Sequence, residues 1–106
     1  MEWLDLERVF QKEPDLKRHG FKNGKENFSY EDFKKCVEWI SEKYTPSKLN
    51  SRKNIDSYVL KHILEEEKGG YVPNGAVIAA AICLNIPYKR LKNNPNAILY
   101  MKELEA

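Results

Sequence analysis

The segment that most limits how this chain can fold is residues 76–84, AVIAAAICL. It is apolar on every side, so a helix made of it has no face suited to water and must be buried nearly all round. Its alanines allow neighbouring backbones to approach closely, and Pro87 prevents the helix from continuing. Asn74 is the expected N-cap. We expect residues 78–82 to be largely buried, with the other elements packed around them.

Two helices are predicted before this segment, over residues 2–11 and 29–43. Trp3, Leu6 and Phe10 repeat at helical spacing in the first, with Val9 beside them. In the second, Ser29 is a good N-cap and Asp32 follows three residues later, a shortened capping box. Its apolar stripe comprises Tyr30, Phe33, Val37, Ile40 and Tyr44, widened by Cys36 and Trp39.

A further helix is predicted over residues 55–68, with Asp56 or Ser57 at its start and Gly69-Gly70 at its end. The inner face assigned from the apolar residues comprises Ile55, Tyr58, Val59, Ile63 and Leu64, widened by Leu60. Residues 20–28 and 45–54 are expected to be loops, the first anchored by Phe21 and Phe28. Residues 88–101 are expected to form a β-hairpin around an Asn-rich turn at 93–96.

The expected fold class is therefore mainly α with a small C-terminal β-hairpin, in a single domain over residues 1–106. A chain of 106 residues with 42% hydrophobic residues has room for one core. No apolar run reaches the length needed to span a membrane, and acidic residues replace the positive charge of a signal peptide in residues 1–11. Cys36 and Cys83 lack CxxC spacing and are expected to be thiols in a reducing cytoplasm.

The order helix, short turn, helix and hairpin over residues 55–101 is that of a winged helix-turn-helix. The same stretch contains Ser57-Tyr58-Val59-Leu60-Lys61-His62, then residues 71–81, YVPNGAVIAAA, and then Pro95-Asn96-Ala97. This pattern resembles one found in short uncharacterised proteins of phages, prophages and plasmids. The resemblance covers about half of the chain and implies a mobile-element context. Residues 1–50, including the helices predicted within residues 1–44, fall outside it.

Positive charge gathers in two short clusters in the C-terminal half. Residues 44–64 carry Lys48, Arg52, Lys53 and Lys61 against Asp56, whereas residues 69–101 carry three cations and no acid. Such clusters bind phosphate or an acidic protein surface, or they are simply solvated. The candidate nucleic-acid-binding residues are Lys48, Arg52, Lys53, Lys89, Arg90, Lys92 and Asn94.

One feature argues against base reading by the apolar helix. Residues 76–84 contain no Arg, Lys, Gln, Ser or Thr, whereas recognition in the major groove needs polar side chains at base edges. Any nucleic acid must then be held by the basic clusters, mostly through phosphates, with Asn93, Asn94 and Asn96 as groove readers at the hairpin tip. That arrangement predicts weak or shape-driven specificity.

Few other residues suggest chemistry. His62 has no metal-ligand spacing to His19 and is interpreted as a surface or structural histidine, with a hydrogen bond to the 71–74 turn as one option. Asn74-Gly75 is interpreted as a helix cap, although exposed N–H groups there would also suit a phosphate. Glu65, Glu66 and Glu67 point in different directions on a helix and are expected to be solvated. We therefore expect no catalytic residues, no metal and no cofactor.

Two functions fit these observations. The first is a small non-enzymatic nucleic-acid-binding protein of a phage or mobile element. The alternative is a protein-binding inhibitor or modulator of a host defence or replication enzyme, in which the basic clusters meet an acidic surface.

Overall fold

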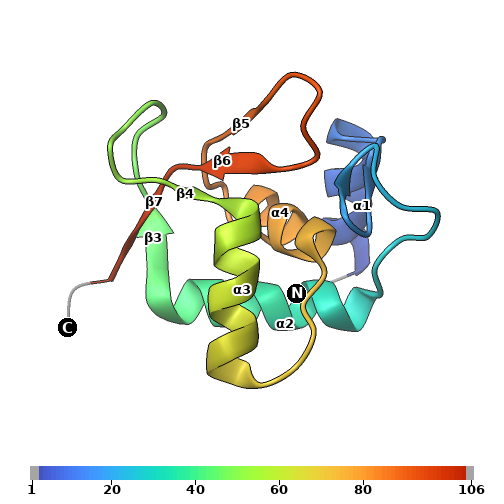
Figure 1. Cartoon of the computed structure of the whole chain (residues 1–106), viewed down its shortest axis with the longest axis horizontal. Helices are drawn as coiled ribbons and strands as arrows, with labels where there is room; N and C mark the ends of the chain where they lie inside the picture. The colour runs from blue at the N-terminus through green and yellow to red at the C-terminus, as the bar shows by residue number, and fades with distance from the viewer. Residues whose placement is uncertain (1–2, 105–106) are drawn as a thin grey trace.

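The apolar segment forms the central helix of the fold. The computed structural model describes residues 3–104, and in it α4 (Asn74–Cys83) is covered on several sides (Figure 1). Its neighbours are α1 (Trp3–Lys12), α2 (Tyr30–Lys43), α3 (Ser57–Lys68) and a hairpin of β1 (Leu16–Lys17) and β2 (Gly20–Phe21). Every residue from Asn74 to Ala81 is buried, which confirms the prediction for residues 78–81, whereas Ile82 is half-buried.

The first two helices lie close to where the sequence places them. The capping box of α2 is confirmed: the Asp32 N–H donates to Ser29 Oγ at 3.1 Å, and the Ser29 N–H donates to Asp32 Oδ2 at 3.4 Å. Leu6 and Val9 of α1 are buried, while the predicted contribution of Trp3 lies outside the described side chains. Phe21 and Phe28 anchor the segment between these helices, as predicted.

The buried face of α3 differs from the predicted one. Its core positions are Ser57, Leu60, Lys61 and Leu64, which follow the helical spacing i, i+3, i+4 and i+7. Tyr58 and Val59, predicted to face inward, have 47% and 51% of their surface exposed. The prediction is confirmed for Leu60 and Leu64 but wrong for Tyr58 and Val59. Two polar residues occupy inner positions, so the apolar residues alone trace a face rotated away from the core. Asp56 is the N-cap and Gly69 the left-handed C-cap, as predicted.

The C-terminal hairpin is present and belongs to a larger antiparallel sheet. β5 (Tyr88–Arg90) pairs with β6 (Ala97–Leu99), and β6 also pairs with β4 (Ile55–Asp56), so the strand order is β4-β6-β5. β3 (Tyr44–Pro46) pairs with β7 (Met101–Glu103) and ties the end of the described chain to the end of α2.

The prediction of a single two-stranded hairpin is therefore wrong. Four further short strands, β1 to β4, lie before residue 70. Each has only two or three residues, which is too short for an alternating pattern to be visible, and β3 and β4 pair with strands from the far end of the chain.

The β1–β2 hairpin seals the start of α4. The Gly75 N–H donates to the Arg18 carbonyl at 2.9 Å, and a Cβ at Gly75 would lie only 1.8 Å from the Lys17 carbonyl oxygen. The predicted N-cap role of Asn74 is wrong, because Pro73 is the N-cap and Asn74 is the first residue of the helix. The Asn74 side chain instead donates to the His19 carbonyl and to Asn96 Oδ1, at 3.1 and 2.9 Å.

All of these elements contribute to one hydrophobic core, so the described residues form a single globular α/β domain. Within that part of the chain, no helix has both the length and the apolar character needed to cross a membrane.

Candidate functional site

The first basic cluster lies in the loop between β3 and β4. Lys48, Arg52 and Lys53 are all exposed there, and none of them has an ion-pair partner among residues 3–104. The loop is held by Ser47 Oγ, which donates to the Lys53 carbonyl at 2.6 Å, so the cations are presented on an ordered backbone. Lys102 of β7 borders the same loop and adds a cation that the sequence analysis did not select.

The second cluster lies on β5 and the turn that follows it. Lys89 pairs across the sheet with Ile98, which in turn pairs with Asp56, and cross-strand partners share a face. Tyr88, Leu99 and Ile55 form the opposite face, which packs on the core. Lys89 therefore lies on the outer face of the β4-β6-β5 sheet, and Lys92 is exposed in the turn.

Arg90 differs from the other candidates, because its guanidinium group is bound within the chain. It donates to Asp15 at 2.6 and 3.1 Å and to Glu13 at 3.1 Å, and it lies 3.9 Å from the centroid of the Phe21 ring. The hydrogen bonds from Arg90 lower the pKa of Asp15. Alternation along the strand explains this, since Arg90 follows Tyr88 by two residues and shares its inward face. Arg90 is exposed, as expected, but its guanidinium group is held by Asp15 and Glu13 and is not free for a ligand.

Asn94 is exposed at the tip, but its side chain also shapes the turn. Its Oδ1 accepts the Asn96 N–H at 2.8 Å. The Asn96 side chain accepts from Asn74, so of the three predicted groove readers only Asn93 has neither of these commitments.

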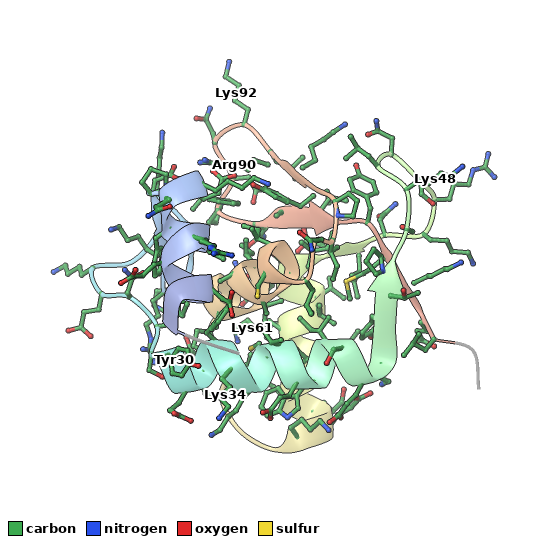
Figure 2. All side chains as sticks on the ribbon, turned by 180° about the vertical axis from the view of Figure 1, so that it is seen from behind. Tyr30, Lys34, Lys48, Lys61, Arg90 and Lys92 are labelled. Atoms are coloured by element: carbon green, nitrogen blue, oxygen red, sulfur yellow. The ribbon has the colours of Figure 1, made fainter. Side chains whose placement is uncertain are left out.

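The outer face of the sheet links the two basic clusters. β4 runs parallel to β5, so the 47–54 loop precedes one end of the sheet and the 91–96 turn follows the other. Both connections project toward the same edge of the molecule in Figure 1, and Figure 2 shows Lys48 and Lys92 at their outer ends. We call the set Lys48, Arg52, Lys53, Lys89 and Lys92 the basic face.

The start of the central helix offers no binding surface. Asn74 is 2% exposed, Gly75 is buried, and the Gly75 N–H is already bonded to Arg18. The phosphate interpretation of Asn74-Gly75 is therefore wrong. The cap interpretation is also wrong for Asn74, which acts through its side-chain hydrogen bonds, whereas Gly75 does permit a close approach, by the β1–β2 hairpin. Base reading by α4 is excluded for the same reason.

Lys61 and Glu65 fix the turn between α3 and α4. Lys61 Nζ donates to Glu65 Oε2 at 2.8 Å, and the same oxygen accepts the Val72 N–H at 3.0 Å. The bond from Lys61 is the main cause of the lowered pKa of Glu65. The prediction that Glu65 is merely solvated is wrong, and it is Glu65, not His62, that bonds to the turn. The His62 side chain lies at the surface, with its Nδ1 3.2 Å from Glu65 Oε1.

Two exposed tyrosines lie beside this ion pair. The ammonium group of Lys61 is 5.6 Å from the ring centroid of Tyr58 and 4.8 Å from that of Tyr71. Sequence reasoning placed Tyr58 in the core and gave Tyr71 only a bridging role. The one sequence feature that joins them is the pattern that resembles phage and plasmid proteins, because it contains Tyr58, Lys61, His62 and Tyr71.

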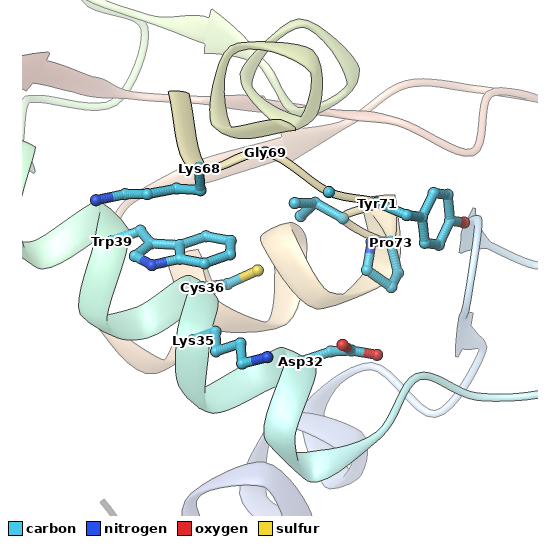
Figure 3. A pocket seen from close by; sticks show the side chains of 10 residues that line it. Asp32, Lys35, Cys36, Trp39, Lys68, Gly69, Tyr71 and Pro73 are labelled. Atoms are coloured by element: carbon cyan, nitrogen blue, oxygen red, sulfur yellow. The ribbon is translucent and has the colours of Figure 1, made fainter. Parts of the chain in front are cut away.

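A pocket of about 180 Å³ lies between α2 and the α3–α4 turn (Figure 3). Cys36 and Trp39 line it, with Lys35 and Lys68 at its margin, and Figure 3 shows Tyr71 turned away from it. Burial raises the pKa of Cys36 to about 12, so its thiol stays protonated and is a poor nucleophile. Asp32 also lines the pocket, but its carboxylate is used in the capping box.

Among the described residues, no group of three or more His, Cys, Asp or Glu side chains is placed to hold a metal ion.

Comparison with known proteins gives no further guide: no protein-family model matches the chain, and no curated protein or solved structure is significantly similar to it. The resemblance to short phage and plasmid proteins stays a prediction.

Proposed function

We propose that this protein binds nucleic acid through its phosphates, using the basic face. The observation that carries the proposal is the placement of the five cations of the basic face. All five are exposed, and none has an ion-pair partner within residues 3–104. They lie on one face of the sheet and in the loops at its two ends. Cations arranged along a line suit a polyanion, because each one releases a counterion from the backbone that it neutralises.

The mode of binding differs from that of a conventional helix-turn-helix. The order α3, α4, β5 and β6 follows that of a winged helix-turn-helix, which supports the proposal at the level of architecture. However, the helix in the recognition position is enclosed by α1, α2 and the β1–β2 hairpin. Contacts to phosphate position a protein without reading bases, so the proposed binding has little sequence preference.

A charge reversal on the basic face tests the proposal. Lys89→Glu combined with Lys92→Glu should weaken binding to single-stranded and duplex oligonucleotides of any sequence by roughly tenfold or more at low salt. Arg90 is left unchanged, because reversing it would place a carboxylate beside Asp15 and Glu13.

The matched control is Lys34→Glu with Lys35→Glu on α2. These two lysines are exposed, and Figure 2 shows Lys34 at the edge of the molecule opposite Lys92. The control alters net charge equally and should leave most of the affinity in place. Equal losses in the two variants, or no binding by the unmodified protein at low salt, would refute the proposal and favour a protein partner.

A further inference from the structure

Aromatic rings and cations from α3, from the turn after it and from the β1–β2 hairpin lie together. Tyr58 and Tyr71 are 47% and 54% exposed, and the Lys61 ammonium group lies close to both rings. Arg18, from the β1–β2 hairpin, lies 5.4 Å from the Tyr71 ring centroid. His62 meets Tyr58 edge-on at 4.5 Å between centroids, and the Tyr71 hydroxyl lies 3.4 Å from His19 Nδ1. We call these six residues the aromatic cluster.

Of the two carboxylates beside this cluster, Asp56 caps α3 through the Tyr58 N–H, and Glu65 is neutralised by Lys61. Glu65 accepts hydrogen bonds from Lys61 and from the Val72 N–H, and it lies 3.2 Å from His62. Arg18 has no ion-pair partner among residues 3–104. The cluster therefore combines half-exposed aromatic rings with an uncompensated cation.

The aromatic cluster begins where the outer face of the sheet ends. Tyr58 follows β4 after one residue, and its N–H donates to Asp56 Oδ1 at 2.7 Å. Asp56 is the cross-strand partner of Ile98, whose other partner is Lys89 of the basic face. The start of the aromatic cluster therefore adjoins the sheet face that carries Lys89.

We propose that the aromatic cluster binds the bases of a single-stranded nucleic acid whose phosphates lie on the basic face. This rests on the proposed function and adds a preference for single strands. Aromatic side chains beside a basic groove bind unpaired bases by stacking, which tolerates any sequence. A duplex keeps its base faces inside, so it gains nothing from the tyrosines.

The composition of the cluster favours this ligand over a protein. Tyr and Arg are also common in protein interfaces, but there they are surrounded by further apolar contact, whereas here Val59 is the only exposed aliphatic residue on the described part of α3 beside the rings. Arg18, the cation beside Tyr71 that has no ion-pair partner among residues 3–104, suits a phosphate between stacked bases, whereas Lys61 is buried and bonded to Glu65.

The test measures affinity for a single-stranded DNA and for its duplex by fluorescence anisotropy. Tyr58→Ala and Tyr71→Ala should each weaken single-strand binding by about tenfold, the loss expected when one stacked base loses its ring. Tyr58→Phe and Tyr71→Phe should restore most of that affinity, since the ring does the stacking. Duplex affinity should change less than twofold in all four variants.

Val59→Ala is the matched control, because Val59 is as exposed as Tyr58 and lies on the same helix. It should not alter single-strand binding. Thermal melting identifies any variant that fails to fold, and the phenylalanine variants keep the test valid in that case. If alanine and phenylalanine variants both bind like the original protein while Lys89→Glu/Lys92→Glu does not, the cluster proposal is overturned and the basic face stands. If no variant, nor the original, binds either form, both proposals fail.

Discussion

Substituting Gly75 by alanine tests how the β1–β2 hairpin closes over α4. The Cβ of alanine would lie 1.8 Å from the Lys17 carbonyl oxygen, 2.9 Å from its carbonyl carbon and 3.0 Å from the Arg18 oxygen. All three are backbone atoms, and non-bonded carbon contacts are comfortable only at about 3.5 Å or more. The hairpin must therefore move away from the helix.

That movement weakens two hydrogen bonds, from the Gly75 N–H to Arg18 and from Asn74 to the His19 carbonyl. Each contributes about 1 kcal/mol, and strain from overpacking adds about 1–3 kcal/mol. Alanine is the better helix former by about 1 kcal/mol, which offsets part of the cost. We expect the free energy of unfolding to fall by about 2–4 kcal/mol.

Urea unfolding followed by circular dichroism measures this change, and amide exchange at Phe21 locates it. The Phe21 N–H donates to the Pro95 carbonyl at 2.9 Å, so it should exchange faster when the hairpin is displaced. Helix propensity alone predicts the opposite sign. A Gly75→Ala protein as stable as the original, with unchanged exchange at Phe21, would refute the close packing described here.

Three other changes follow from the same structure. Ala80→Glu should prevent cooperative folding, because an unpaired charge would enter a fully buried site at a cost of several kcal/mol; an unchanged melting curve would show that α4 is exposed. Arg90→Gln should lower stability by about 1 kcal/mol in urea unfolding, since Asp15 and Glu13 lose a shared cation, and no loss would show that these ion pairs do not stabilise the fold. The folded-state pKa of Glu65 is depressed, so its stabilising effect is present above its ordinary pKa of 4.5 and is lost as pH falls below that value. Glu65→Gln should therefore be less stable than the original protein at neutral pH, and the gap should narrow below pH 4.5; a gap independent of pH would contradict this.

The sequence predicts the elements whose stability is local or strongly patterned. The run 76–84 can only be buried, and Ser29 with Asp32 marks the start of α2 through bonds between near neighbours. The hairpin over 88–101 is likewise found where its Asn-rich turn indicates. The cap and the turn involve near neighbours, and the apolar run is visible in the sequence whichever elements cover it.

The errors arise where tertiary contacts override residue type. Lys61 is buried because Glu65 and two tyrosine rings take the place of the water that would otherwise solvate its ammonium group. No pattern of apolar residues indicates that a lysine is buried. The pairing of β4 with β6 joins segments more than forty residues apart.

The basic face was predictable in large part, since four of the six predicted cations lie on its loops or turn and Lys89 lies on its sheet face. Arg90 could have been separated from them by counting: it follows Tyr88 by two residues on one strand and must share its face. Its partners Glu13 and Asp15, however, lie on a segment that no local pattern brings near.

The salt dependence of binding to duplex DNA is the most direct measurement of whether the basic face contacts phosphates. Three to five contacts predict a slope of about −3 to −4.5 in log K against log salt, at about −0.9 per contact. Lys89→Glu with Lys92→Glu should bring that slope closer to zero by about 2, because two contacts are removed. A slope near zero, or no binding at low salt where this attraction is strongest, would contradict the proposed function.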